Sequence, residues 1–273
     1  MNILNQVSPK RFRTIDDLLA FISIYDDYKR TQAYQRLLRA YKNKIKGSVC
    51  VEGGCGLGIF STEMVKLGAR KVYAIEQNPL LANLARNKID NLPKYLAQRI
   101  EVVEEPLQSF QPRRHIDVLV QELYGQLLYD EDLWVLEHLK FKPDVVLPNR
   151  GELLAGVVSS ASYRDAVVTP GVIEQLQGVL VDGLLEEKLT ELRFPVLEWK
   201  YGKGLTHVRR SIKGLKGDLL CFGVSLTHNE KRICEAGKCP NWSYVWTARA
   251  GDKFEFTFQK SSASLGCFFR WIR

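Results

Sequence analysis

The chain has 273 residues, of which 45% are hydrophobic, and its 39 basic and 31 acidic residues give a formal net charge of +8. This length suits one large domain or two ordinary domains with real hydrophobic cores. No run approaches the roughly 18 apolar residues of a membrane-spanning helix, and residues 1–17 lack the apolar stretch of a signal peptide. We therefore expect a globular protein of the cytoplasm that does not enter membranes, whose charge permits an anionic partner without requiring one.

Two helices are predicted before the first strand. Thr14, followed by Asp16 and Asp17, is typical of an N-cap with acids in the first turn, and it opens an apolar-periodic segment over 18–22. A second helix is predicted from Arg30 to Lys46, because apolar residues recur there at the spacing of a buried stripe. The stripe consists of Tyr34, Leu37, Leu38, Tyr41 and Ile45.

Residues 49–147 alternate between short apolar runs and helical patterns. The expected strands are 49–52, 71–76, 100–103, 115–121 and 144–147. The expected helices are 60–67, 78–89 and 131–139. Strands separated by helices imply a parallel sheet with helices on both faces, so the fold class is α/β and the sheet is Rossmann-like and doubly wound.

The pattern changes at Pro148-Asn149-Arg150-Gly151. Beyond it, short alternating runs separated by turn signals predict an all-β sandwich or barrel. Its strands are expected at 153–159, 179–184, 206–212, 219–226, 243–248, 253–259 and 265–272. We therefore predict two domains: residues 1–148, with the N-terminal helices and the Rossmann-like sheet, and residues 149–273, which are β-barrel-like.

Four glycines follow the first predicted strand, in Val51-Glu52-Gly53-Gly54-Cys55-Gly56-Leu57-Gly58. Such a turn is where nucleotide-like ligands sit in open α/β sheets, since glycine tolerates positive φ and lets a ligand approach the main chain. A dinucleotide motif needs a glycine where Ile59 stands, so a nicotinamide cofactor is disfavoured. Glu76 ends the second strand, as an acceptor for ribose hydroxyls should. The carboxylate of Glu52 suits a cofactor with a cationic ammonium, namely S-adenosylmethionine, and the alternative is a glycine turn without a ligand.

The six cysteines are too few and too scattered for a disulfide scaffold, so reduced thiols are expected. Cys234 and Cys239 with His228 offer three zinc ligands. Their spacing is not CxxC and no convincing fourth ligand follows. No metal site is therefore predicted, and a polar loop is the preferred interpretation.

Basic residues gather in two stretches without acids. Residues 28–51 hold seven lysines and arginines, and residues 200–217 hold six. Nucleic acids favour such surfaces, but neither stretch has the interleaved aromatic residues of a single-strand platform. Solvated faces are therefore preferred, and nucleic acid is a partner that the sequence allows but does not favour.

The order and spacing of motifs through the first 150 residues resemble those of the protein arginine methyltransferases. The motifs are Arg30-Thr31 with Tyr34, the glycine segment 51–59, Ala74-Ile75-Glu76, Glu122-Leu123-Tyr124-Gly125 with Glu131, and Pro148-Asn149-Arg150-Gly151. The β-rich second half fits that family's substrate barrel. Pro240-Asn241-Trp242 falls where its Thr-His-Trp loop is expected.

The resemblance implies roles for individual residues. On the cofactor side it assigns Arg30 to the carboxylate, Glu76 to the ribose hydroxyls, Gln108 to the neighbourhood of the adenine, and the main chain around Gly54, Gly56 and Gly58 to the methionine and sugar. Glu122 and Glu131, nine residues apart, match the paired glutamates that grip the substrate guanidinium. On the substrate side lie Tyr34, Asn241 and Trp242, and Trp242 would form a wall of the pocket.

Two carboxylates also make chemical sense without the family. A guanidinium is a planar fork of five donors that keeps its proton, so it must be held and polarised before it can attack a methyl group. Two carboxylates fix its plane and draw positive charge away from the attacking nitrogen. Glu122 follows the fourth strand at the carboxyl edge, where α/β sites form. Glu131 has a second explanation, because Asp130-Glu131-Asp132 at a helix N-terminus is also what the helix dipole favours.

The sequence departs from the family pattern in three places. Asn241 replaces the family histidine, the aromatic motif before Arg30 is reduced to Phe21-Ile22-Ser23-Ile24-Tyr25, and the second domain is short. This leaves little room for the arm through which such enzymes pair, although Leu184 to Lys203 could serve, so a homodimer is allowed rather than predicted.

The leading hypothesis is an S-adenosylmethionine-dependent N-methyltransferase that acts on arginine in a protein, in a peptide or as the free amino acid. The alternatives are methylation of another small cationic nitrogen, methylation of nucleic acid, and a non-catalytic module that keeps the cofactor fold. The lack of an Asn/Asp-Pro-Pro-Tyr type motif argues against methylation of a base. Retention of both Glu122 and Glu131 argues against a non-catalytic module.

Overall fold

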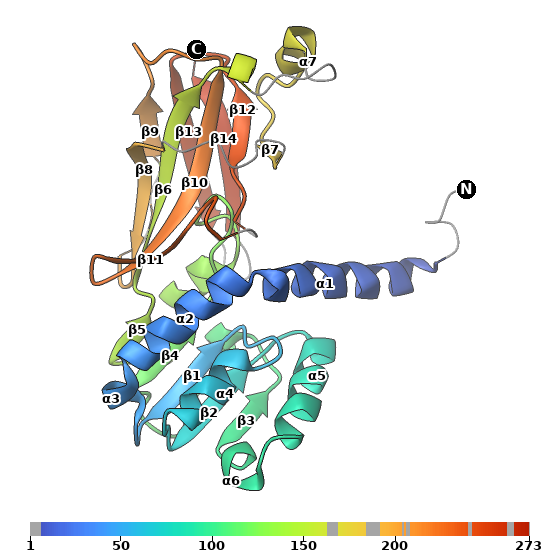
Figure 1. The fold of residues 1–273 in the computed structure, drawn as a ribbon, viewed down its shortest axis with the longest axis vertical. Coiled ribbons are helices and arrows are strands. Elements are labelled where there is room, and N and C mark those ends of the chain that lie inside the picture. Colours follow the sequence, from blue (N-terminus) through green and yellow to red (C-terminus); the bar gives the residue numbers. More distant parts are fainter. Residues whose placement is uncertain are drawn as a thin grey trace.

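The computed structural model describes residues 7–162, 169–183, 192–203, 205, 208–239, 242–260 and 265–272. A parallel sheet from the first half of the chain and antiparallel sheets from the second half stand end to end (Figure 1). The helix Tyr28–Ala40 crosses between them, and the helix Pro9–Asp26 projects to one side. In the described part of the chain, no helix is both long enough and apolar enough to cross a membrane.

The N-terminal helices are α1 (Pro9–Asp26), α2 (Tyr28–Ala40) and α3 (Lys42–Ile45). The prediction that Thr14 caps the first helix is wrong, because Ser8 and Pro9 begin it earlier. The Ser8 side chain accepts a hydrogen bond from the Arg11 N–H at 3.3 Å, whereas the Thr14 hydroxyl donates within the helix to the Lys10 carbonyl at 3.2 Å. The single helix predicted from Arg30 to Lys46 is broken at Tyr41 into α2 and α3. Of its predicted apolar stripe, Tyr34, Leu37, Leu38 and Ile45 are buried, and Tyr41 is partly buried.

Five parallel strands form the first sheet in the order β3-β2-β1-β4-β5. All five expected strands are found, with ends shifted by a few residues: β1 (Val49–Gly53), β2 (Lys71–Ile75), β3 (Ile100–Val103), β4 (Val118–Gln121) and β5 (Val145–Leu147). The strand order reverses between β1 and β4, and ligands of open α/β sheets bind at the carboxyl ends beside such a reversal. The predicted Rossmann-like class is confirmed.

The helices α4 (Ile59–Lys66), α5 (Pro79–Asp90) and α6 (Lys94–Ala97) lie on one face of this sheet, as right-handed crossovers require (Figure 1). The return connections place the 3₁₀ helices η2 (Leu107–Ser109) and η3 (Asp132–Glu137) on the other face. The α-helix expected over 131–139 is therefore wrong in type. Four consecutive residues of η3 are buried, so the segment has no single apolar stripe of α-helical period.

The second half forms antiparallel strands in two sheets, β7-β12-β10-β6-β8 with β11 paired to β10, and β14-β13-β9. All seven expected strands are found as β6 (Arg150–Val158), β7 (Val181–Asp182), β9 (Val208–Ser211), β10 (Leu219–His228), β12 (Val245–Ala248), β13 (Lys253–Lys260) and β14 (Leu265–Ile272). The sequence did not predict β8 (Phe194–Lys200), an edge strand that contains Pro195, or β11 (Lys231–Glu235), which opens with two charges. Short helices η4 (Ser160–Ser162) and α7 (Pro170–Gln175) follow β6.

One contiguous hydrophobic cluster runs from α2 and the parallel sheet into the barrel strands. Tyr124 contacts Trp199 and Trp242 edge-on, with ring centroids 5.7 Å and 6.5 Å away. At the end of α2, the Tyr41 hydroxyl lies 2.6 Å from His228 Nε2 and accepts a hydrogen bond from the Asn229 amide at 2.8 Å. The topology changes between β5 and β6, but a division into two domains at residues 148 and 149 stays a proposal.

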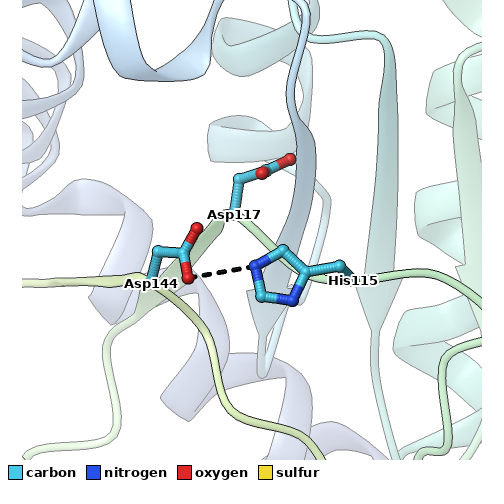
Figure 2. A group of neighbouring side chains, drawn as sticks. All are labelled: His115, Asp117 and Asp144. Carbon is cyan, nitrogen blue, oxygen red and sulfur yellow. Dashed lines mark ion pairs between the residues drawn. The ribbon is translucent and has the colours of Figure 1, made fainter.

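Polar contacts join the amino ends of the central strands. His115 Nε2 lies 3.0 Å from Asp144 Oδ1 (Figure 2). Asp117 Oδ2 accepts a hydrogen bond from the Val49 N–H at 2.7 Å. His115 and Asp117 precede β4, Asp144 precedes β5, and Val49 begins β1, so these contacts lie at the edge of the sheet opposite the glycine turn.

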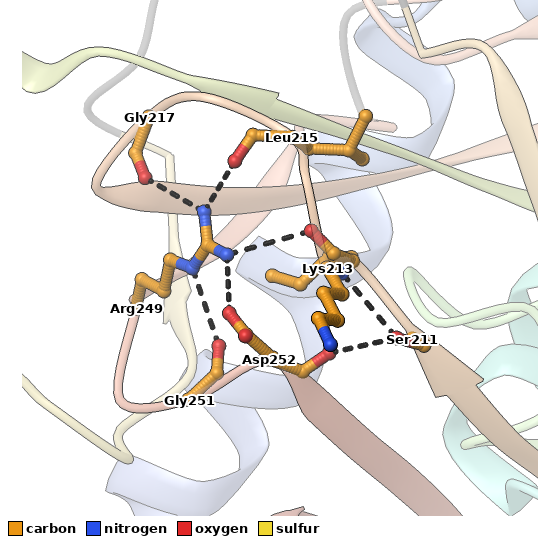
Figure 3. A network of polar contacts seen from close by, with 8 residues as sticks. Ser211, Lys213, Leu215, Gly217, Arg249, Gly251 and Asp252 are labelled. Carbon is orange, nitrogen blue, oxygen red and sulfur yellow. Dashed lines mark hydrogen bonds and ion pairs between the residues drawn. The ribbon is translucent and has the colours of Figure 1, made fainter.

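Arg249, directly after β12, joins two loops of the barrel (Figure 3). Its guanidinium donates to the carbonyls of Leu215 at 2.7 Å and Gly217 at 3.2 Å. It also donates to the Gly251 carbonyl at 3.2 Å and to Asp252 Oδ1 at 2.5 Å. One planar fork therefore ties the connection between β9 and β10 to the connection between β12 and β13.

Candidate active site

The glycine turn bends sharply between β1 and α4. Gly54, Gly56 and Gly58 have φ values of +66°, +52° and +67°, a region that disfavours other residues. The Gly56 N–H donates to Glu76 Oε2 at 2.9 Å, and the Leu57 N–H donates to the Tyr25 hydroxyl at 2.8 Å. The turn is therefore held from two sides, by the end of β2 and by α1.

Replacement of Gly56 by alanine is expected to destabilise the fold more than the same change at Gly214. Both glycines have positive φ, which costs about 1–2 kcal/mol for a residue with a side chain. A Cβ at Gly56 would also lie 2.1 Å from Phe21 Cζ, whereas one at Gly214 would meet nothing within 4 Å. Urea unfolding of both variants measures the difference, and equal losses would show that Phe21 does not cover the turn in solution.

A pocket of about 310 Å³ opens beside this turn. Three residues predicted for the cofactor line it: Gly54, Glu76 and Gln108. The Glu76 carboxylate accepts one bond from Gly56 and one at 2.8 Å from the Asn78 N–H. Since a carboxylate has about four lone-pair positions, it retains capacity for further donors.

The sequence analysis assigned no other residue to this pocket, although Phe21 and Leu123 belong to motifs that it named. The lining includes Phe21, Gln77, Leu107, Leu123, Asp132 and Trp134. Phe21 and Tyr25 stand one helical turn apart on α1, with ring centroids at 4.7 Å. Their spacing of four residues is the signal that identifies a shared helix face, but nothing in it reveals that this face covers the glycines.

Glu52 lies away from the pocket. Its carboxylate accepts hydrogen bonds from the Phe60 N–H at 3.2 Å, the Ser61 N–H at 2.6 Å and the Ser61 hydroxyl. Burial raises the pKa of Glu52 to about 7, against the lowering effect of the Ser61 bonds. Glu52 thus caps α4, it is absent from the described pocket lining, and its predicted contact with a cofactor ammonium stays a prediction.

Arg30 and Glu122 form a buried ion pair next to the pocket. Arg30 Nη1 lies 3.3 Å from Glu122 Oε1, and Nη2 donates to the Ile24 carbonyl at 3.2 Å. The Arg30 guanidinium carbon lies 5.5 Å from the centroid of the Trp242 ring. Burial raises the pKa of Glu122 to about 7, although the Arg30 charge opposes the shift. The structure thus brings together three predicted residues from α2, from the end of β4 and from the barrel.

Tyr34 belongs to the same buried region. Its ring stacks on Phe60 with centroids 5.0 Å apart, and its hydroxyl has no hydrogen-bond partner among the described residues. Burial and the Glu122 charge raise the pKa of Tyr34. Asn241, also predicted for the substrate side, lies outside the described residues.

Glu131 is brought back toward Glu122 by the loop between them. A Cβ on Gly125 would lie only 3.0 Å from Glu131 Cγ, and the Leu127 N–H donates to Asp130 Oδ1 at 2.9 Å. Partial desolvation and then the charges of Asp130 and Glu122 raise the pKa of Glu131 to about 7. Both predicted glutamates therefore have a raised pKa, Glu122 mainly through burial and against the Arg30 charge, and Glu131 through burial and the neighbouring acids.

The structure bears on two predictions, that the cysteines are reduced and that Cys234, Cys239 and His228 form no metal site. Cys234 and Cys239 are joined by a disulfide, so the expectation of reduced thiols is wrong for this pair, and His228 contacts Tyr41 instead of these cysteines. Among described residues, one group has potential ligand atoms within 4.8 Å of one another: His115, Asp117 and Asp144. It lies at the amino ends of β4 and β5 and plays no part in the pocket.

No family model matches the chain. The probable histone-arginine methyltransferase 1.4 of Arabidopsis thaliana is 31% identical over 156 residues, which are 56% of this chain and 29% of that protein. Protein arginine N-methyltransferase 6 of Danio rerio is 29% identical over 149 residues, which are 52% of this chain and 41% of that protein. The match therefore spans less than half of either relative.

Solved structures agree with the chain in fold. The Trypanosoma brucei PRMT1 enzyme-prozyme heterotetrameric complex with AdoHcy superposes with a TM-score of 0.69 at 13% identity, over 92% of this chain and 96% of that one. Protein arginine methyltransferase 10 of Arabidopsis thaliana superposes with a TM-score of 0.65 at 17% identity, over 91% and 92%. Both the Rossmann-like sheet and the following antiparallel sheets are therefore shared. The resemblance seen in the motif order is confirmed. This chain is similar to the protein arginine methyltransferases in sequence over about half of its length and in fold over nine tenths of it.

Proposed function

We propose that the chain is an S-adenosylmethionine-dependent N-methyltransferase that acts on the guanidinium of arginine. The observation that carries the proposal is that Glu122 already holds one guanidinium, that of Arg30, and that the same guanidinium faces the Trp242 ring. This arrangement lies beside the glycine pocket. A site with a buried carboxylate and an aromatic face suits a planar cation. The similarity to arginine methyltransferases supports the same function.

The pocket by the glycine turn fits the proposed cofactor. Gly54 brings main chain to its surface, Glu76 offers free acceptor positions for ribose hydroxyls, and Gln108 offers an amide. Arg30, at the border with Glu122, offers a cation for a carboxylate. When bound, S-adenosylmethionine supplies an electrophilic methyl group on a sulfonium.

Glu122 and Glu131 have the main chemical task in this proposal. As carboxylates they accept hydrogen bonds from the substrate guanidinium and hold its plane, so that one nitrogen points at the methyl group. That nitrogen would form the new bond to the methyl carbon while the carbon–sulfur bond breaks and its electron pair stays on the sulfur of S-adenosylhomocysteine. The nearby carboxylates would accept the proton that the nitrogen loses, directly or through water. The proposal names these two residues as catalytic, with Tyr34, Asn241 and Trp242 on the substrate side.

The pH dependence of the reaction follows from the two raised pKa values. Below about pH 7 Glu122 and Glu131 are increasingly protonated and neutral, and a neutral carboxyl attracts a guanidinium weakly. We expect kcat/KM for an arginine peptide to rise with pH through about 7, with a log–log slope between about 1 and 2 below it, and to level off above it. A profile that stays flat from about pH 6 to pH 8 would contradict this assignment.

Transfer of a labelled methyl group tests the function. The protein is incubated with methyl-labelled S-adenosylmethionine and an arginine-rich peptide, its lysine counterpart, free arginine, another small cationic amine, or RNA. Label is expected on arginine alone. Label on RNA or on the other amine would show that this molecule, and not arginine, is the substrate. A thermal shift with S-adenosylhomocysteine without transfer of label to any of these molecules would favour a non-catalytic cofactor-binding module.

The finer expectations rest on the same proposal. We expect an arginine-containing protein or peptide, or free arginine, as substrate, and the cytoplasm as the place of action. A homodimer stays one allowed assembly. Part of the expected pairing arm, residues 184–191, lies outside the described residues, and β8 occupies 194–200.

A further inference from the structure

A basic groove lies away from the glycine pocket. Two pockets of about 560 Å³ and 620 Å³ adjoin each other, because both are lined by Gln111, Pro112, Arg113 and Arg114. The first continues along β2 and β3, and the second continues to residues 140–142 before β5. None of their lining residues lines the pocket beside the glycine turn.

Four cations of this groove are uncompensated. Arg113, Arg114, Lys140 and Lys142 are exposed, and none forms an ion pair with a described residue. No acid is among the described residues that line the second pocket, and the exposed Asp144 nearby pairs with His115 of that lining at 3.0 Å. The first pocket contains Glu101, whose carboxylate already contacts Lys71 at 2.7 Å. The groove therefore presents a positive surface to an incoming ligand.

Aromatic rings stand on both sides of the arginine loop. Phe110 is buried, and its ring centroid lies 5.3 Å from that of Tyr73 and 5.8 Å from that of Phe141. Tyr73 and Phe141 are half-buried, and each lines one of the two pockets. Cations alternate here with apolar rings, and a chain of phosphates and bases matches that alternation.

We propose that this groove binds single-stranded nucleic acid, with phosphates at Arg113, Arg114, Lys140 and Lys142 and with bases against Tyr73 and Phe141. An acidic peptide would satisfy the cations but has no planar groups for the rings. The combination comes from residues 71–73, 110–114 and 140–142, so no single stretch of sequence contains it. This site is independent of the proposed methyl transfer.

Fluorescence anisotropy with labelled oligouridine tests the proposal. A probe of about 12 nucleotides matches the usual size of a single-strand site. The charge reversal Arg113→Glu with Arg114→Glu is expected to weaken binding at least about tenfold. It should also reduce the slope of log K against log salt by about 1.4, since each phosphate contact to a single strand contributes about 0.7.

The matched control reverses two exposed lysines of the barrel, Lys216→Glu with Lys231→Glu, so that the net charge changes equally. Circular dichroism verifies that both variants fold. Retained affinity in the control and loss in the groove variant would support the proposal. Equal loss in both variants, or binding of an oligoglutamate as tight as that of the oligouridine, would overturn it.

Discussion

Replacement of Glu122 by glutamine is expected to lower kcat/KM for methyl transfer to arginine at least about 100-fold, as loss of a single preorganised electrostatic contact does in other enzymes. Glutamine keeps the shape of the side chain but removes the negative charge that holds the guanidinium. Glu131→Gln should lower it by a similar factor, since the loop brings its charge into the same region. Radiolabel transfer to an arginine peptide at about pH 8 measures both effects, because both glutamates are then ionised.

Measurement of the free energy of unfolding distinguishes a loss of catalysis from misfolding of the variant. Burial raises the pKa of Glu122 in the folded state, so its ionised form opposes folding as the pH rises above the unfolded pKa of about 4.3. Glu122→Gln removes that cost, and Arg30 keeps its contacts with Asp27 and the Ile24 carbonyl, so the variant should remain folded at pH 8. Glu104→Gln, at a surface pair with Arg86, is the matched control and should keep full activity. Full activity of Glu122→Gln would refute the catalytic assignment.

Replacement of Arg249 by methionine is expected to reduce the free energy of unfolding by about 2–4 kcal/mol. The change keeps most of the apolar stem and leaves carbonyls of two loops and the Asp252 carboxylate without their shared donor. Hydrogen bonds to a charged group contribute about 1.5–3 kcal/mol each, but bonds to one side chain are not additive. Urea unfolding measures the loss.

Arg210 supplies the comparison for Arg249. It is exposed and donates to two carbonyls, those of Pro195 and Arg209. Arg210→Met should therefore change the free energy of unfolding by less than about 0.5 kcal/mol. The loss in the free energy of unfolding for Arg249→Lys should lie between those for Arg249→Met and Arg210→Met, because an ammonium keeps the charge but not the planar fork. If Arg249→Met were no more harmful than Arg210→Met, the loops would be held by other contacts.

Local patterns were sufficient to predict most of the fold. The alternation of strands and helices predicts the parallel sheet, because each element carries its own period. Glu76 and Glu122 follow strands, so their place at the carboxyl edge is also predictable. The sequence does not predict the strand β11, because Lys231 and Arg232 interrupt its apolar pattern. The sequence pattern does not predict the 3₁₀ form of η3, because burial of this segment on all sides depends on tertiary contacts.

Contacts between distant segments account for what the sequence could not predict. Arg30 and Glu122 are 92 positions apart, and their ion pair joins α2 to the residue that follows β4. Tyr25 meets the Leu57 N–H only because α1 passes over the turn. Glu52 precedes the glycines, as a cofactor contact would, yet its carboxylate reaches forward to the start of α4. Chain position alone does not distinguish a ligand contact from a helix cap.

The continuity of the hydrophobic cluster has a consequence for how the molecule unfolds. The cluster includes residues on both sides of the change in topology, and α2 contacts barrel side chains through Arg30 and Tyr41. Separation of the chain near residue 149 would expose this shared surface to water, at about 25 cal/mol for each Å² of apolar area. We therefore expect the two halves to unfold as one cooperative unit, so that a small molecule bound to one half protects the amides of the other against hydrogen exchange.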